Sequence, residues 1–168
     1  MIRPFVNTII LFILLVFLQV FIFNSIQFSN LINPYFYVIY ILLLPFETPG
    51  WILLVSSFFL GFTIDSFSNT LGLHASACTF MAVIRPSVLK WFSPRDGYEP
   101  GTLPRLSYYG FGWFMKYTIL LVFAHHFVIF FLEIFRLSDF FFTLSRTIFS
   151  TIFTSAIIIL SQFFVFRK

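Results

Sequence analysis

The sequence is short of charge. Only 10% of its 168 residues are Asp, Glu, Lys or Arg, whereas a soluble globular domain carries about 25%. Apolar residues make up 60% of the chain, and the mean hydropathy is +0.98. This composition excludes a soluble enzyme, a disordered chain and, despite a pI of about 9.5, a nucleic-acid-binding protein. It predicts an all-α integral membrane protein with several spans.

Cysteine and the common catalytic motifs are also scarce. The single cysteine, Cys78, excludes an internal disulfide and a cysteine-based zinc site. The chain has no H-E-x-x-H, G-x-S-x-G, P-loop or dinucleotide-binding pattern. A haem would need two facing histidines at similar depth, and His74, His125 and His126 lack a spacing that predicts this. We therefore expect no enzymatic activity, no cofactor and no metal.

Long apolar runs predict six transmembrane helices in one multi-pass domain covering residues 1–168. A crossing helix needs about 20 mostly apolar residues, and the second run, which follows Pro34 and ends near Pro45, is short. The 29 Phe residues suggest lipid-facing bulk without a specific function. The expected helices cover about 5–23, 31–46, 51–65, 71–90, 110–132 and 140–166, with a hydrophilic loop at 91–109.

The basic residues indicate whether the short second run crosses. With six crossings and a cytoplasmic N-terminus, eight basic residues fall on the cytoplasmic side and two outside, as the positive-inside rule favours. With five crossings the loop 91–109 would lie outside, opposite to Arg3. The sequence thus predicts six spans with both termini in the cytoplasm. The eight are Arg3, Arg85, Lys90, Arg95, Arg105, Lys116, Arg167 and Lys168, and the two are Arg136 and Arg146.

A polar stretch between the third and fourth runs contains the strongest site candidates. Gly61 and Asp65 lie four residues apart on one helix face, where a small residue lets another helix approach closely. Asp65 beside apolar sequence must be capped, paired or near the interface. Two interpretations stay open. Asp65 and the polar residues 66–70 satisfy the helix ends, or a specific Asp65–His74 contact orders the turn for a partner.

The last two runs carry further polar groups. His126 and Glu133 share a helix face, and Glu133 can pair with Arg136 three residues on. These residues form either a local polar cluster or part of a docking surface or ligand cavity. A stripe of hydroxyl and amide side chains along 143–162 indicates either a contact inside the bundle or a lateral interface.

The loop 91–109 combines prolines, glycines, aromatic residues and both signs of charge. Proline and glycine favour fixed turns, and the aromatic residues suit a membrane interface. The loop is either a generic solvated connection or a surface that faces a partner. Its candidate residues are Arg95, Asp96, Tyr98, Glu99 and Arg105.

These motifs resemble those of the rod shape-determining protein MreD family, in particular its Bacteroidetes-type branch. The central pattern is similar to the G-x-x-x-D … L-G-x-H-A pattern of that family. The resemblance covers most of the chain from about Pro49 and is loose over the first helix. The residues that carry it include Gly61, Asp65, Gly72, His74, Arg85, Pro86, Arg95, Asp96, Tyr98, Glu99, His125, His126 and Glu133.

The resemblance implies a non-enzymatic scaffold of the bacterial cell-elongation complex in the cytoplasmic (inner) membrane. Its implied partners are the periplasmic scaffold MreC, the RodA glycosyltransferase with its penicillin-binding transpeptidase, membrane lipid and, indirectly, MreB filaments. The family is also similar in its six-helix arrangement to the substrate-binding subunits of energy-coupling-factor vitamin transporters.

Such a transporter subunit is the alternative function. Its size, basic pI and six spans fit, but such subunits commonly dock through small residues on the first helix, and residues 5–23 contain no Ala or Gly. An intramembrane enzyme would need a paired acid and base or a nucleophile, which the expected helices do not offer. The sequence therefore favours the scaffold.

Overall fold

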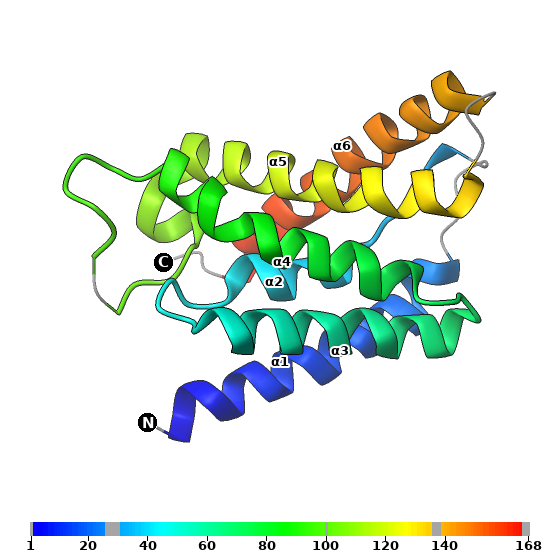
Figure 1. Cartoon of the computed structure of the whole chain (residues 1–168). Helices are drawn as coiled ribbons and strands as arrows, with labels where there is room; N and C mark the ends of the chain where they lie inside the picture. The colour runs from blue at the N-terminus through cyan, green and yellow to red at the C-terminus, as the bar shows by residue number, and fades with distance from the viewer. Residues whose placement is uncertain (1, 26–30, 100, 136–138, 166–168) are drawn as a thin grey trace.

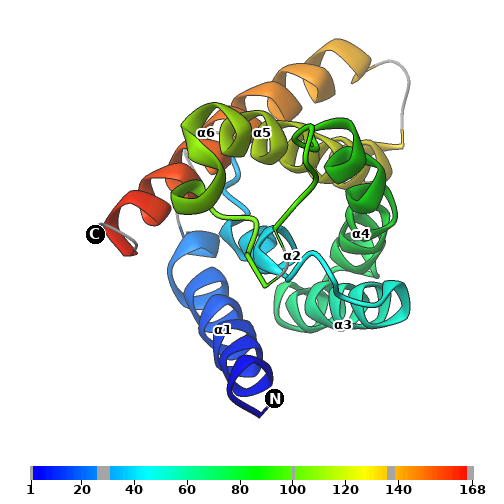
Figure 2. The ribbon, with the colours of Figure 1, turned by 90° about the vertical axis from the view of Figure 1, so that its left-hand side faces the viewer.

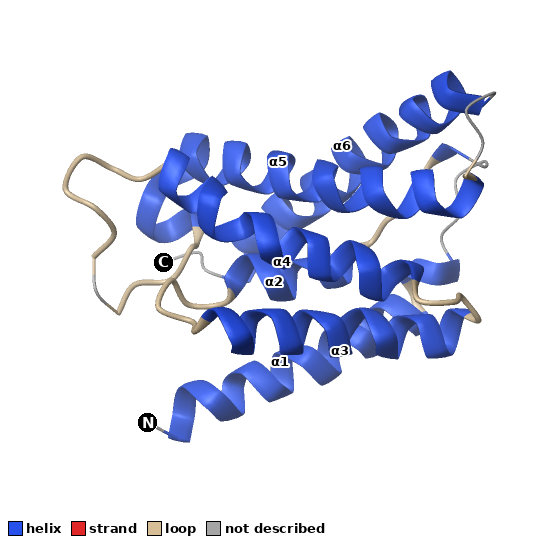
Figure 3. Ribbon diagram, in the orientation of Figure 1, coloured by secondary structure: helices blue, strands red, loops and turns tan. Residues whose placement is uncertain are grey.

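The computed structural model describes residues 2–25, 31–99, 101–135 and 139–165, which form helices joined by loops (Figure 3). Three basic residues used in the charge count, Arg136, Arg167 and Lys168, lie outside these ranges. Five helix positions agree with the sequence prediction to within a few residues. The elements are α1 (Ile2–Phe21), η1 (Phe23–Ser25), η3 (Phe36–Val38), α2 (Ile39–Leu43), α3 (Gly50–Ser68), α4 (Leu73–Trp91), α5 (Leu106–Ile134) and α6 (Phe140–Val165).

The long helices form a bundle around α2. Figure 1 places the start of α1, the loop between α4 and α5 and the end of α6 at one end of the molecule, here called the loop end. The α3–α4 turn and the end of α5 lie at the opposite end, here called the turn end. Viewed from the loop end, α1, α3, α4, α5 and α6 surround α2 (Figure 2).

Residues 31–46 do not form the continuous helix that the sequence predicts. The chain has no regular structure over residues 33–35, passes through η3 and then makes only the five-residue α2. This segment is nevertheless deeply buried, because Tyr37, Val38, Ile41 and Leu42 are all 0% exposed. Non-helical backbone is tolerated at membrane depth only where protein covers it and satisfies its polar groups.

Gln19 of α1 provides hydrogen-bond partners for part of this buried backbone. Its Nε2 donates to the carbonyl of Pro34 at 3.0 Å, and its Oε1 accepts from the backbone N–H of Tyr37 at 3.3 Å. Nε2 also lies 3.0 Å from Oδ1 of Asn24. A buried amide on a mostly apolar helix thus replaces hydrogen bonds that a regular helix would make internally.

The polar stripe of α6 provides hydrogen-bond partners for further backbone groups of the segment 31–46. Ser150 Oγ accepts from the backbone N–H of Asn33 at 3.0 Å and donates to the carbonyl of Leu31 at 3.2 Å. Thr154 Oγ1 accepts from the backbone N–H of Tyr35 at 3.2 Å. At these positions the stripe makes a contact inside the bundle, which is the first of the two interpretations left open above.

Four helical segments are long and apolar enough to cross a membrane: Thr8–Ser25, Gly50–Ser68, Leu106–Ile134 and Phe140–Phe164. Their outward faces carry large apolar side chains, such as Ile13 (62% exposed) on α1 and Ile152 (61% exposed) on α6. An apolar exterior of this extent suits contact with lipid rather than water. The more polar α4 packs between α3 and α5, so protein covers part of its surface.

Candidate functional site

Asp65 caps the start of α4 from the end of α3. Its Oδ1 accepts from the backbone N–H of His74 at 3.1 Å and from the hydroxyl of Thr70. Its Oδ2 accepts from the backbone N–H of Ala75 at 2.9 Å. The first N–H groups of a helix lack internal partners, and a carboxylate there also stabilises the helix dipole. Asp65 therefore contacts the backbone of His74, and the structure places it in the capping role.

Gly61 permits this capping because it brings α3 against α4. A Cβ atom at Gly61 would lie 2.5 Å from the Cα atom of Ala75 and still closer to the carbonyl oxygen of His74. The contact is with backbone, which cannot rotate away. Gly72 has a different role, because its φ of +81° starts α4 in the left-handed region that favours glycine. The expected close packing of the third and fourth helices is present.

The imidazoles of His74 and His125 are joined through one tyrosine hydroxyl. Tyr37 Oη lies 2.7 Å from Nδ1 of His74 and 2.8 Å from Nε2 of His125. A phenol carries one proton, so it donates to one ring and accepts from the other. Cys78 Sγ lies 3.8 Å from the same Nε2, and Nδ1 of His125 has no partner among the described residues.

His126 faces a different set of atoms from its neighbour. Its Nδ1 lies 2.8 Å from the carbonyl of Val122, and its Nε2 lies 3.3 Å from Thr154 Oγ1. The ring of Tyr35 packs against His74, His125 and His126, with centroid separations of 5.0, 5.9 and 5.3 Å. The three histidines thus contact the segment 31–46 through the side chains of Tyr35 and Tyr37.

Glu133 of α5 pairs with a basic residue of α6. Its Oε2 accepts from Nη1 of Arg146 on α6 at 2.8 Å, whereas the partner expected from the sequence, Arg136, lies outside the described residues. The guanidinium carbon of Arg146 also sits 4.2 Å from the ring centroid of Phe130. With its amide oxygen turned toward Arg146, Asn33 accepts from Nε and Nη2 at 3.0 and 2.7 Å.

A polar pocket of about 290 Å³ opens beside this ion pair at the turn end. Both signs of charge line it, through Glu133 and Arg146, together with the imidazole of His74. It brings together two candidates, His74 and Glu133, that lie far apart in the sequence. Asp65, His125 and His126 are not among its lining residues.

The loop between α4 and α5 is clamped by aromatic residues. The ring of Tyr98 stacks on Phe46 with centroids 4.1 Å apart, and its hydroxyl donates to the carbonyl of Leu89 at 2.7 Å. Partial burial raises the pKa of Tyr98, so its hydroxyl remains a donor at neutral pH. The indole of Trp113 donates to the carbonyl of Phe92 at 2.9 Å. The loop therefore has a defined shape.

Three further hydrogen bonds hold the far part of this loop. Tyr109 Oη lies 2.6 Å from Thr102 Oγ1 and accepts from the backbone N–H of Glu99 at 3.3 Å. The backbone N–H of Gly101 donates to Oε1 of Glu47 at 3.1 Å. The side chains of Arg95, Asp96 and Glu99 are exposed above this frame, while Arg105 is partly buried.

The sequence interpretation missed the role of Arg85. The charge count only places it on the cytoplasmic side, at the end of the expected helix 71–90, whereas the structure shows that it is buried within α4 at 1% exposure. Its Nε donates to the hydroxyl of Tyr117 at 2.9 Å, and its Nη2 donates to the carbonyl of Leu44. A charge inside an apolar run is a signal of a functional position, and that signal was available in the sequence.

The polar groups of this region hydrogen-bond to one another and to the backbone. Both oxygens of Asp65 accept hydrogen bonds from backbone N–H groups, and Oδ1 also accepts one from the Thr70 hydroxyl; the imidazoles hydrogen-bond within the protein. In the described part of the chain, no group of three His, Cys, Asp or Glu side chains could hold a metal ion. No family model, no curated protein and no solved structure matches the chain.

Proposed function

We propose that this protein is a non-enzymatic membrane scaffold of the bacterial cell-elongation complex. The observation that supports it best is the clamped loop between α4 and α5. Aromatic stacking fixes the backbone, and Arg95, Asp96 and Glu99 project from it. A surface held in one shape loses little entropy when a partner binds. The resemblance of the sequence to the MreD family supplies the identity of the partners.

The proposed topology has six crossings, with both termini and the loop end in the cytoplasm. The segment 31–46 is its second crossing, shielded from lipid by the surrounding helices. The position of the α1 start, the loop and the α6 end on one side of the bundle supports an even number of crossings. The excess of basic residues at this end supports its cytoplasmic location.

The proposed partners divide between the two ends and the lateral faces. The MreC-like scaffold, the RodA-like glycosyltransferase and its penicillin-binding transpeptidase would pack against the exposed apolar helix faces. The loop end would face the cytoplasm and connect indirectly to MreB filaments. The buried polar groups around Asp65 and Tyr37 keep these surfaces in a fixed relationship.

Depletion in rod-shaped cells tests the scaffold role. Loss of the protein should make the cells wider and then round, because wall synthesis would no longer be confined to elongation. Re-expression of the wild-type chain should restore the rod shape, and an unrelated membrane protein produced at the same level should not. Unchanged cell width after full depletion would refute the proposal.

The pocket at the turn end favours a second candidate, a vitamin-binding subunit of an energy-coupling-factor-type transporter. A cavity of about 290 Å³ lined by Glu133, Arg146 and His74 has the size and polarity of a site for a small molecule. Native mass spectrometry of the purified protein distinguishes the candidates. A stoichiometrically retained vitamin would support the transporter subunit and contradict the scaffold.

A further inference from the structure

The guanidinium of Arg85 is buried without a carboxylate partner in the described part of the chain. Its two hydrogen bonds go to neutral oxygens, those of Tyr117 and Leu44. A guanidinium has five N–H donors, so most of its hydrogen-bonding capacity is unused by these contacts. Buried charges are normally paired, because an isolated ion in an apolar interior is strongly unfavourable. A neighbouring anion would therefore stabilise the buried charge on Arg85.

A cavity adjoins this side chain at the loop end. It has a volume of about 540 Å³ and is lined by Arg85, Lys90, Thr48, Ser93 and Tyr98, among other residues. None of the lining residues is Asp or Glu. The cavity thus combines two cationic side chains with three hydroxyl groups. The three hydroxyl groups already donate to backbone carbonyls, so the two cations are the groups that would bind the oxygens of a phosphate.

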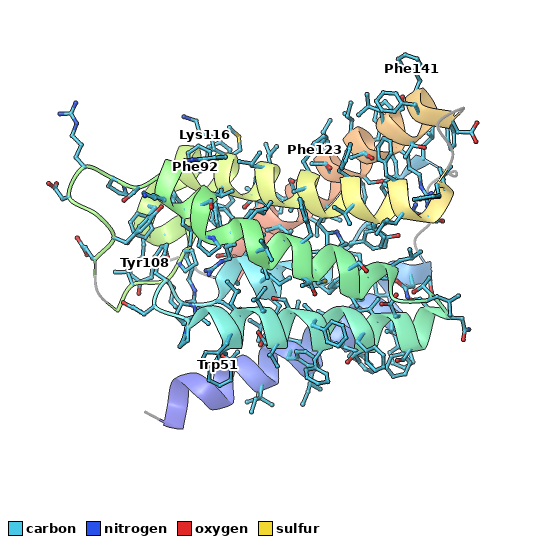
Figure 4. The ribbon with its side chains drawn as sticks, in the orientation of Figure 1. Trp51, Phe92, Tyr108, Lys116, Phe123 and Phe141 are labelled. Atoms are coloured by element: carbon cyan, nitrogen blue, oxygen red, sulfur yellow. The ribbon has the colours of Figure 1, made fainter. Side chains whose placement is uncertain are left out.

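The cavity also has an apolar side, formed by Phe46, Leu53 and Leu89. Two of its lining residues, Gly50 and Lys90, are the immediate neighbours of Trp51 and Trp91, which are 69% and 73% exposed. Exposed tryptophan is typical of the membrane–water interface. Figure 4 shows Trp51 and Phe92 toward the loop end of the bundle. The cavity therefore lies at the depth of lipid headgroups.

We propose that this cavity binds the phosphate headgroup of an anionic membrane lipid, with Arg85 and Lys90 as its cationic ligands. Arginine matches two phosphate oxygens with its planar fork, and lysine adds a point charge. The apolar side would accept the start of the acyl chains. This site does not depend on the scaffold role, so either can fail without the other.

Native mass spectrometry of the full-length protein in detergent tests the site. The probes are phosphatidylglycerol, phosphatidylcholine with the same acyl chains, and inorganic phosphate. We expect phosphatidylglycerol to bind best. Arg85→Gln removes the charge but keeps an amide donor for Leu44, and it should weaken binding about tenfold. Lys90→Gln, at an exposed position, should weaken it about threefold.

Lys116→Gln is the matched control, because it removes an exposed positive charge from α5 outside the cavity. It should leave lipid binding unchanged. If Arg85→Gln does not fold, weaker lipid binding by Lys90→Gln tests the site in its place. Displacement of the lipid by inorganic phosphate would support the phosphate site and show that the headgroup alone suffices. Equal binding of both lipids, or equal losses in Lys90→Gln and Lys116→Gln, would overturn the proposal.

Discussion

The carboxylate of Asp65, on the last turn of α3, accepts a hydrogen bond from the backbone N–H of His74 at 3.1 Å. Nδ1 of the same His74 shares a hydrogen bond with Tyr37 Oη, 2.7 Å away. One residue therefore links the α3–α4 turn to the buried segment 31–46. A substitution at the turn should therefore also affect the packing at the centre of the bundle.

Removing the cap tests the first half of this link. Asp65→Ala leaves the N–H groups of His74 and Ala75 without their acceptor and should destabilise the protein by about 2 kcal/mol. Asp65→Asn keeps one acceptor oxygen and should cost roughly half as much. Thermal unfolding in detergent measures both. Ser66→Ala, an exposed change on the next residue, is the control, and equal unfolding temperatures for all three variants would contradict the capping role.

A methyl group at Gly61 should separate α3 from α4. Gly61→Ala places a Cβ against the backbone of His74 and Ala75, and overpacking of this kind costs about 1–3 kcal/mol. Gly112→Ala is a matched control, because a Cβ there meets nothing within 4 Å. Since alanine favours a helix over glycine, that variant should unfold at the same or a higher temperature. A stable Gly61→Ala protein would disprove the close approach.

The hydroxyl of Tyr37 should matter more than its ring. Tyr37→Phe keeps the aromatic packing but leaves His74 Nδ1 and His125 Nε2 without their shared partner, at a cost of about 1–3 kcal/mol. The unfolding temperature should fall, and it should not fall in Tyr108→Phe, where the side chain is 56% exposed. If both variants unfold at the same temperature as the wild type, the hydroxyl bridge contributes nothing to stability.

Loss of the aromatic clamp should expose the loop to protease. Tyr98→Ala removes both the stack on Phe46 and the hydrogen bond to Leu89, and trypsin should then cleave after Arg95 about fivefold faster, as a loss of about 1 kcal/mol implies. Tyr98→Phe retains the stack and should lie between this variant and the wild type. Tyr108→Ala serves as the control. Unchanged cleavage in Tyr98→Ala would show that the loop is held by other contacts.

Helix positions were predictable because they depend on local sequence. Long apolar runs bounded by proline and polar residues marked five helices, and the Gly61–Asp65 spacing indicated a capped, closely packed turn. The shape of segment 31–46 was not predictable in the same way. Its hydrogen-bond partners include Gln19 on α1 and Ser150 and Thr154 on α6, and the last two lie more than a hundred residues away.

Pairing between helices was the other part that the sequence obscured. Glu133 has a basic residue three positions on in the sequence, and the structure pairs Glu133 with Arg146, thirteen residues on. Arg85 was counted only as a charge on the cytoplasmic side, because it lies near the end of an apolar run. Its burial depends on Tyr117 and Leu44, which only the fold brings beside it.

The central claim is that the clamped loop and the helix faces hold wall-synthesis proteins together. Cross-linked affinity purification of the full-length protein from rod-shaped cells tests it most directly. We predict recovery of MreC-like and RodA-like proteins, together with MreB in an amount that is reduced when Arg95, Asp96 and Glu99 are changed together to Ala and unaffected by Lys116→Gln. Recovery of neither protein from cells that contain both would contradict the account.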